Sequence, residues 1–267
     1  MLKKLHNIFL LLILSIVLNV PVQSAESDLP DGYPLCWMDE INNENFCPIN
    51  INLGHKLFLV DFTSKWEPKQ VDWIKGRIFG NTIIRNTPPY HKITYIKLDE
   101  TAPESQKVVY SKCRFKTGSK SKYLGEEFND ECESIAIVKQ AYQAWQKTLK
   151  KVEKTFFDSH TDAEQSLIIE YIANILREPK IDFTGDYPER KLIIVSDLMQ
   201  NSNRINLYEF CKDACPSFQE LLNTKVEEVD VKYYLDKIKP KNVENLKVEI
   251  RDTDELTDKK GKKLLLT

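Results

Sequence analysis

Glycine and histidine are scarce in this sequence, and neither sign of charge is in large excess. The 267 residues include 8 glycines, and no segment has the glycine spacing of a nucleotide-binding loop. The 4 histidines are scattered, without the spacing of a metal-binding pair. A net charge of -2 leaves no basic excess, which nucleic-acid-binding proteins usually have. The sequence therefore indicates neither nucleotide binding, nor a histidine metal centre, nor nucleic-acid binding.

Long apolar runs are absent except at the amino terminus. Lys3 and Lys4 precede the apolar segment Ile8–Val20, and small residues follow up to Ala25, an order typical of a cleaved secretory signal. The apolar run is shorter than the roughly 20 residues that span a bilayer, which favours cleavage over an uncleaved membrane anchor. We therefore expect residues 1–25 to be a signal peptide. The protein would then be exported, either periplasmic or secreted, with no stable membrane insertion.

All six cysteines follow the expected signal peptide. An oxidising compartment favours disulfides, and neighbouring cysteines bracket loops rich in proline, glycine, asparagine or charge. The expected local pairs are Cys36 with Cys47, Cys113 with Cys132, and Cys211 with Cys215. Zinc binding by the third pair is the weaker interpretation, because neither a second such pair nor a histidine lies nearby.

Two apolar strands are each followed or ended by an aspartate. Leu57–Asp61 ends on its acid and leads into Thr63 and Ser64, whereas Lys191–Ser196 is followed by Asp197. Continuous apolar runs of this length are typical of parallel strands covered on both faces. Open α/β sheets bind ligands at the carboxyl ends of such strands. We therefore expect the two aspartates to contribute to one shared site.

The rest of the chain alternates between strand and helix patterns. Further strands are expected at Lys92–Leu98, Lys107–Tyr110, Lys225–Leu235 and Leu246–Arg251, and helices at Glu67–Gly80, Glu133–Phe157 and Leu167–Leu176. This alternation predicts an α/β fold with a doubly wound, mostly parallel sheet and helices on both faces. The expected divisions are an extended arm over 26–54, the α/β domain over 55–251 and a charged tail over 252–267, with a polar loop at Lys112–Asp130 inside the domain.

Four oxygen-bearing side chains are the candidate metal ligands. They are Asp61, Thr63, Ser166 at the head of the second long helix, and Asp197. Carboxylate and hydroxyl oxygens suit a hard cation such as Mg²⁺. The alternative is structural: both aspartates would accept hydrogen bonds from loop amides or cap neighbouring helices.

At these residues the chain resembles the von Willebrand factor A-like family. Leu59–Lys65 resembles that family's Asp-x-Ser-x-Ser element after the first strand, and Ser196-Asp197 resembles its Thr-Asp-Gly element. The resemblance implies a metal-ion-dependent adhesion site, with Ser166 in the place of a ligand from a middle loop. Two residues depart from the pattern: Lys65 replaces the third hydroxyl, and Leu198 replaces the glycine. An ammonium group at position 65 would repel a divalent cation and could pair with Asp61.

The functional expectation is an exported protein-binding module that coordinates Mg²⁺ at the carboxyl edge of its sheet. Trp66, in the loop beside Asp61, is the candidate for direct contact with the partner protein. One alternative is a metal-free structural component of an envelope assembly. A Mg²⁺-dependent phosphoester hydrolase is a third possibility, but the sequence offers no general base for it, and we expect no enzyme activity.

Overall fold

The computed structural model gives an α/β fold in the described part of the chain. The described residues are Cys47, 52–80, 83, 86–88, 90–99, 102–106, 108–114, 135–158, 163–177, 181–183, 187–211, 217–226, 229–239 and 243–252. The expected signal peptide, most of the arm and of the polar loop, and all of the tail but Asp252 lie outside them.

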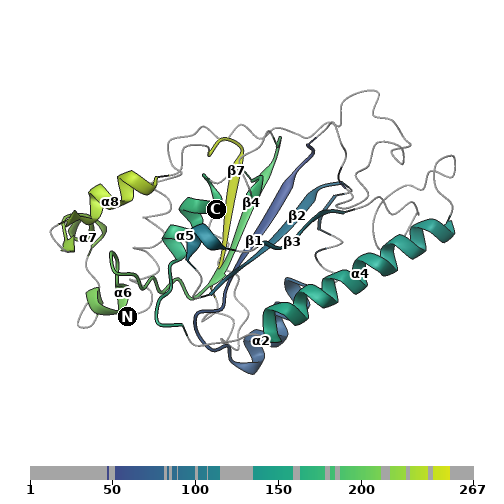
Figure 1. The fold of residues 1–267 in the computed structure, drawn as a ribbon, viewed down its shortest axis with the longest axis horizontal. Coiled ribbons are helices and arrows are strands. Elements are labelled where there is room, and N and C mark those ends of the chain that lie inside the picture. Colours follow the sequence, from purple (N-terminus) through teal and green to yellow (C-terminus); the bar gives the residue numbers. More distant parts are fainter. Residues whose placement is uncertain are drawn as a thin grey trace.

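Five strands form the central sheet, in the order β3-β2-β1-β4-β7 (Figure 1). The strands are β1 (His55–Asp61), β2 (Lys92–Leu98), β3 (Val108–Cys113), β4 (Arg190–Ser196) and β7 (Leu246–Asp252). All neighbours pair in parallel except β3, which runs antiparallel to β2. The mostly parallel sheet is therefore confirmed, and the strand that ends on Asp61 lies at its centre.

Helices cover both faces of the sheet, as expected. The longer described elements are α2 (Pro68–Arg77), α4 (Ile135–Asp158), α5 (Ile168–Ile175) and α8 (Val231–Ile238); the shorter ones are η2 (Pro103–Ser105), α6 (Leu207–Phe210) and α7 (Phe218–Leu222). Phe58 and Val60 of β1 pack in one core with α2 and α4. Leu57 and Leu59 pack in the other core with α5 and α8, which lie on the opposite side of the sheet from α2 and α4 in Figure 1. Successive side chains of β1 thus point alternately into the two cores.

The segment predicted as a single strand over Lys225–Leu235 instead holds two short strands and the first part of a helix, so that prediction was wrong. Two short strands, β5 (Lys225–Val226) and β6 (Val229–Asp230), form a separate ribbon, and α8 follows directly. The apolar side chains of α8 have helical spacing, and they lie on the core that contains α5: they are Val231, Tyr234, Leu235 and Ile238. Burial along this stripe favours a helix over the strand that the local alternation suggested.

One disulfide also differs from expectation. Cys47 is bonded to Cys113, with Cα atoms 4.8 Å apart, so the predicted pairings of Cys47 with Cys36 and of Cys113 with Cys132 were wrong. The sheet explains the long-range pair. Because β3 is antiparallel, Cys113 lies opposite Lys92, which in turn lies opposite the first residue of β1. The segment before β1 therefore meets the end of β3 at the amino edge of the sheet.

Cys211 is also disulfide-bonded. Cys215, the expected partner of Cys211, lies outside the described residues, as do Cys36 and Cys132. None of the helices in the described part of the chain is long and apolar enough to cross a membrane.

Candidate metal site at the carboxyl edge of the sheet

Asp61, the last residue of β1, is the centre of the candidate site. Its side chain is buried, and its Oδ1 accepts hydrogen bonds from the backbone N–H of Thr63 at 2.9 Å and from the Thr63 hydroxyl at 2.7 Å. Its Oδ2 accepts a hydrogen bond from the Ser196 hydroxyl, at the end of β4, at 2.6 Å. The ends of two adjacent parallel strands therefore meet through this carboxylate.

The segment that leads into α5 brings Ser166 to the same edge. Backbone hydrogen bonds join Ser166 and Asn201 in both directions, at 2.9 and 2.8 Å. Ala163, just upstream, donates its N–H to the carbonyl of Thr63 at 3.0 Å. The predicted residues Asp61, Thr63 and Ser166 therefore come together, although they belong to segments about a hundred positions apart in the chain.

The hydroxyl of Ser166 is buried and has no hydrogen-bond partner of ordinary geometry among the described residues. It nevertheless lies near enough to Asp61 to help lower the pKa of that carboxyl group. An unsatisfied buried polar atom costs on the order of 1–3 kcal/mol, so its presence calls for an explanation. A hard cation between the Ser166 oxygen and the Asp61 carboxylate would provide one, and the residues present fit such an ion.

The electrostatics of Asp61 point in the same direction. Burial raises the pKa of its carboxyl group, and the hydrogen bonds from Ser196 and Thr63, together with the nearby Ser166 hydroxyl, oppose that rise without cancelling it. The negative charge is therefore incompletely stabilised by its hydroxyl neighbours. A cation bound at this position would supply the missing stabilisation.

Asp197, the fourth predicted ligand, follows the last residue of β4. Its Oδ1 accepts a hydrogen bond from the backbone N–H of Met199 at 2.9 Å, which closes a short turn. Leu198, within that turn, has a φ of 62°, in the left-handed region that favours glycine. The backbone at Leu198 thus has a glycine-type conformation, at the position that corresponds to the glycine of the Thr-Asp-Gly element.

The loop after Asp61 places two further predicted residues. Lys65 is exposed and forms no ion pair with Asp61, so the pairing that its ammonium group could have made with this carboxylate is not seen between these two described residues. Trp66 is half-buried: its Nε1 donates to the backbone carbonyl of Asp61 at 2.9 Å, and its ring lies 5.5 Å from that of Phe62. Trp66 therefore braces the loop while part of its ring stays accessible.

Sequence reasoning missed Ser196 as a member of the site. In the sequence analysis it was quoted in the Ser196-Asp197 element but was not counted among the candidate ligands. Its signal was positional, because it ends an apolar strand beside β1, and side chains in register on adjacent strands share a face.

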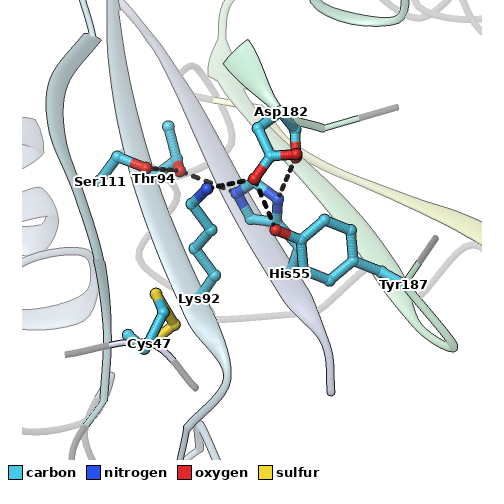
Figure 2. Close-up of polar contacts among 8 residues, drawn as sticks. Cys47, His55, Lys92, Thr94, Ser111, Asp182 and Tyr187 are labelled. Atoms are coloured by element: carbon cyan, nitrogen blue, oxygen red, sulfur yellow. Dashed lines mark hydrogen bonds and ion pairs between the residues drawn. A yellow bond between two sulfur atoms is a disulfide. The ribbon is translucent and has the colours of Figure 1, made fainter. Parts of the chain in front are cut away.

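A second polar cluster lies at the opposite, amino edge of the sheet (Figure 2). The Nε2 of buried His55 lies 2.8 Å from the hydroxyl of Thr94, which is 2.9 Å from that of Ser111. Asp182 accepts hydrogen bonds from the Lys92 ammonium group at 2.5 Å and from the Tyr187 hydroxyl at 2.8 Å. These contacts join three strands to a loop.

The chemistry of His55 argues against a catalytic role for this second cluster. Its Nδ1 lies 3.2 Å from the backbone carbonyl of Asp182, which can only accept, so Nδ1 carries the proton and Nε2 accepts from Thr94. Burial lowers the pKa of His55 to about 3. An imidazole with that pKa is a poor general base near neutral pH. The cluster therefore serves to hold the amino edge together.

Among the described residues, no three His, Cys, Asp or Glu side chains gather as a ligand set. Any metal at Asp61 would accordingly depend on hydroxyl oxygens. No family model matches the sequence, and no curated protein matches it.

Proposed function

We propose that this protein is an exported binding module that holds Mg²⁺ at the carboxyl edge of its sheet and recognises another protein there. The observation that carries the proposal is the buried hydroxyl of Ser166, which lies near the Asp61 carboxylate and has no hydrogen-bond partner of ordinary geometry among the described residues. Asp61, Thr63 and Ser166 would hold the ion. When bound, the ion would supply a positive charge to which an anionic group can attach.

Three features support this proposal. The strand order places Asp61 at the centre of a mostly parallel sheet, at the edge where such sheets bind ligands. The left-handed backbone at Leu198 agrees with the resemblance to the von Willebrand factor A-like family. The disulfide between Cys47 and Cys113 is compatible with an oxidising compartment and hence with export.

The resemblance also suggests the chemistry of the partner. In that family, the open position of the metal takes an acidic group from the partner protein. Here the accessible part of Trp66, in the loop directly after Asp61, would contact the partner beside such a group. Tryptophan is enriched among the residues that dominate the binding energy of protein interfaces.

Isothermal titration of Mg²⁺ and Mn²⁺ into the purified protein tests the proposal, with Asp61→Asn and Asp61→Ala beside it. We expect saturable binding by the wild type and none by either variant. Asp61→Asn keeps the size of the side chain, so it separates the loss of charge from a failure to fold. Absence of binding by the folded wild-type protein would refute the metal site.

The alternative function is a metal-free structural component of an envelope assembly. One observation favours it: Asp61 already accepts hydrogen bonds from Thr63 and Ser196, so it can join β1 to β4 without an ion. This alternative predicts that chelators leave stability and partner binding unchanged. The same titration therefore distinguishes the two functions.

A further inference from the structure

Ser196 and Asp197 occupy adjacent positions at the end of β4 but have different roles. The Ser196 side chain is buried, and its hydroxyl donates to Asp61 Oδ2 at 2.6 Å. The same oxygen accepts a hydrogen bond from the backbone N–H of Leu198 at 2.9 Å. Ser196 is therefore fixed in direct contact with the carboxylate at the centre of the candidate site.

The carboxylate of Asp197 is engaged in its own turn. Its Oδ1 accepts the N–H of Met199 at 2.9 Å, and its side chain is half-buried rather than buried. Successive side chains along a strand point to opposite faces, and β4 ends at Ser196, immediately before Asp197. The contact of Ser196 with Asp61 thus lies at the last residue of β4, and continued alternation would turn the side chain of the following residue to the other face.

Three hydroxyl groups surround Asp61 and still have oxygen lone pairs to offer. A hydroxyl carries one proton and two acceptor lone pairs. Thr63 donates its proton to Asp61, which leaves its oxygen able to bind a cation. Ser196 donates its proton to Asp61 and accepts from Leu198, which leaves one lone pair. Ser166 has no hydrogen-bond partner of ordinary geometry among the described residues.

We infer that Ser196, and not Asp197, completes the cation site, so that this chain binds its ion with one carboxylate and three hydroxyls: Asp61, Thr63, Ser166 and Ser196. This inference rests on the proposed function, because it assigns the ligands of the same site. Ser196 takes the place of the third hydroxyl that the sequence has lost at Lys65. With a single carboxylate, a bound divalent ion keeps a net positive charge, which attracts an anionic group of the partner.

Isothermal titration of Mg²⁺ into four proteins tests this assignment: the wild type, Ser196→Ala, Ser196→Thr and Asp197→Asn. Asp197→Asn keeps an oxygen that can accept the Met199 N–H, so it removes the charge and preserves the turn. We expect Ser196→Ala to weaken Mg²⁺ binding by about tenfold or more. Ser196→Thr should restore most of the affinity, and Asp197→Asn should change it by less than about threefold.

The outcomes separate this inference from the proposed function. If Asp197→Asn abolishes binding while Ser196→Ala retains it, the ligand assignment is wrong and the metal site stands. If the folded wild type binds no Mg²⁺, both are wrong. Thermal unfolding of each variant shows which are folded at the titration temperature. If Ser196→Ala fails to fold, the other two variants still test the ligand assignment. Loss of Mg²⁺ binding by Asp197→Asn, with binding retained by Ser196→Thr, would overturn it.

Discussion

Leu198 occupies a backbone conformation that disfavours its own side chain. Its φ of 62° places it in the left-handed region, which costs a residue with a Cβ atom roughly 1–2 kcal/mol. The side chain is nonetheless buried in the core that contains α5, and burial of a leucine contributes about 2 kcal/mol or more. Burial therefore offsets the strain, which explains how leucine occupies a glycine-type position.

This balance predicts an unusual order of stability at position 198. Leu198→Ala loses the buried side chain and keeps the strain, whereas Leu198→Gly loses the side chain and relieves the strain. We expect both variants to be less stable than the wild type by about 2–4 kcal/mol, with the glycine variant about 1 kcal/mol more stable than the alanine variant. Urea unfolding of the three proteins measures this order. An alanine variant as stable as the glycine variant would contradict the account of strain.

At the residue scale, part of the candidate site could be predicted from the sequence. Asp61 and Thr63 follow from the end of an apolar strand, and Ser166 followed from a family resemblance combined with its place before a helix. The contact of Ser196 could not be predicted, because it depends on the register between β1 and β4, which are more than a hundred residues apart in the chain. Local patterns carry little information about such pairings.

At the scale of elements, the most reliable predictions came from apolar patterns that stay regular over a whole strand or helix. The strands β1, β2 and β4 and the helices α2, α4 and α5 lie within a few residues of their predicted bounds. The prediction failed for α8, whose apolar residues fit both alternation and helical spacing over a short segment. Packing against the core that contains α5, which the sequence does not display, decided between the two.

The disulfide between Cys47 and Cys113 is the clearest case of a feature set by the arrangement of strands. Its two cysteines are 66 positions apart, and the antiparallel return of β3 brings them together at the amino edge. Loop closure of this length is expected to stabilise the fold by up to about 4 kcal/mol in the chain-entropy model.

Peptide mapping of the unreduced protein should therefore yield a linked peptide that contains Cys47 and Cys113. The double variant Cys47→Ala/Cys113→Ala should unfold more easily than the wild type, by up to about 4 kcal/mol under oxidising conditions. A linked peptide containing Cys36 and Cys47 would contradict the structure and would restore the pairing that sequence proximity suggested.

At the scale of the whole molecule, buried His55 and half-buried His91 make stability depend on pH. Burial lowers the pKa of His55 to about 3 and that of His91 to about 4, from the ordinary value of 6.5. Below pH 6.5 the unfolded chain takes up protons at these positions before the folded protein does. Stability contributed by the neutral histidines is therefore present above pH 6.5, and it is lost as the pH falls towards 3.

The replacement His55→Asn tests the larger of these two contributions. Between pH 7 and pH 5, the wild type should lose about 2 kcal/mol more of its unfolding free energy than the variant does. The comparison of two proteins cancels the opposite contribution of Asp61, whose pKa burial raises. Urea unfolding at the two pH values provides the measurement, and equal losses in both proteins would show that His55 does not titrate as described.

The central claim is that the carboxyl edge holds a cation beside Asp61, and Ser166 provides its most direct test. Because the buried Ser166 hydroxyl has no hydrogen-bond partner of ordinary geometry among the described residues, its removal should not weaken the metal-free fold.

The measurement is thermal unfolding of the wild type and Ser166→Ala, each with a chelator and with saturating Mg²⁺. With the chelator, Ser166→Ala should be as stable as the wild type or up to about 1 kcal/mol more stable. Mg²⁺ should stabilise the wild type, by about 1.4 kcal/mol at ten times its dissociation constant, and the variant much less. Equal responses of the two proteins to Mg²⁺, or no response of the wild type, would contradict the account.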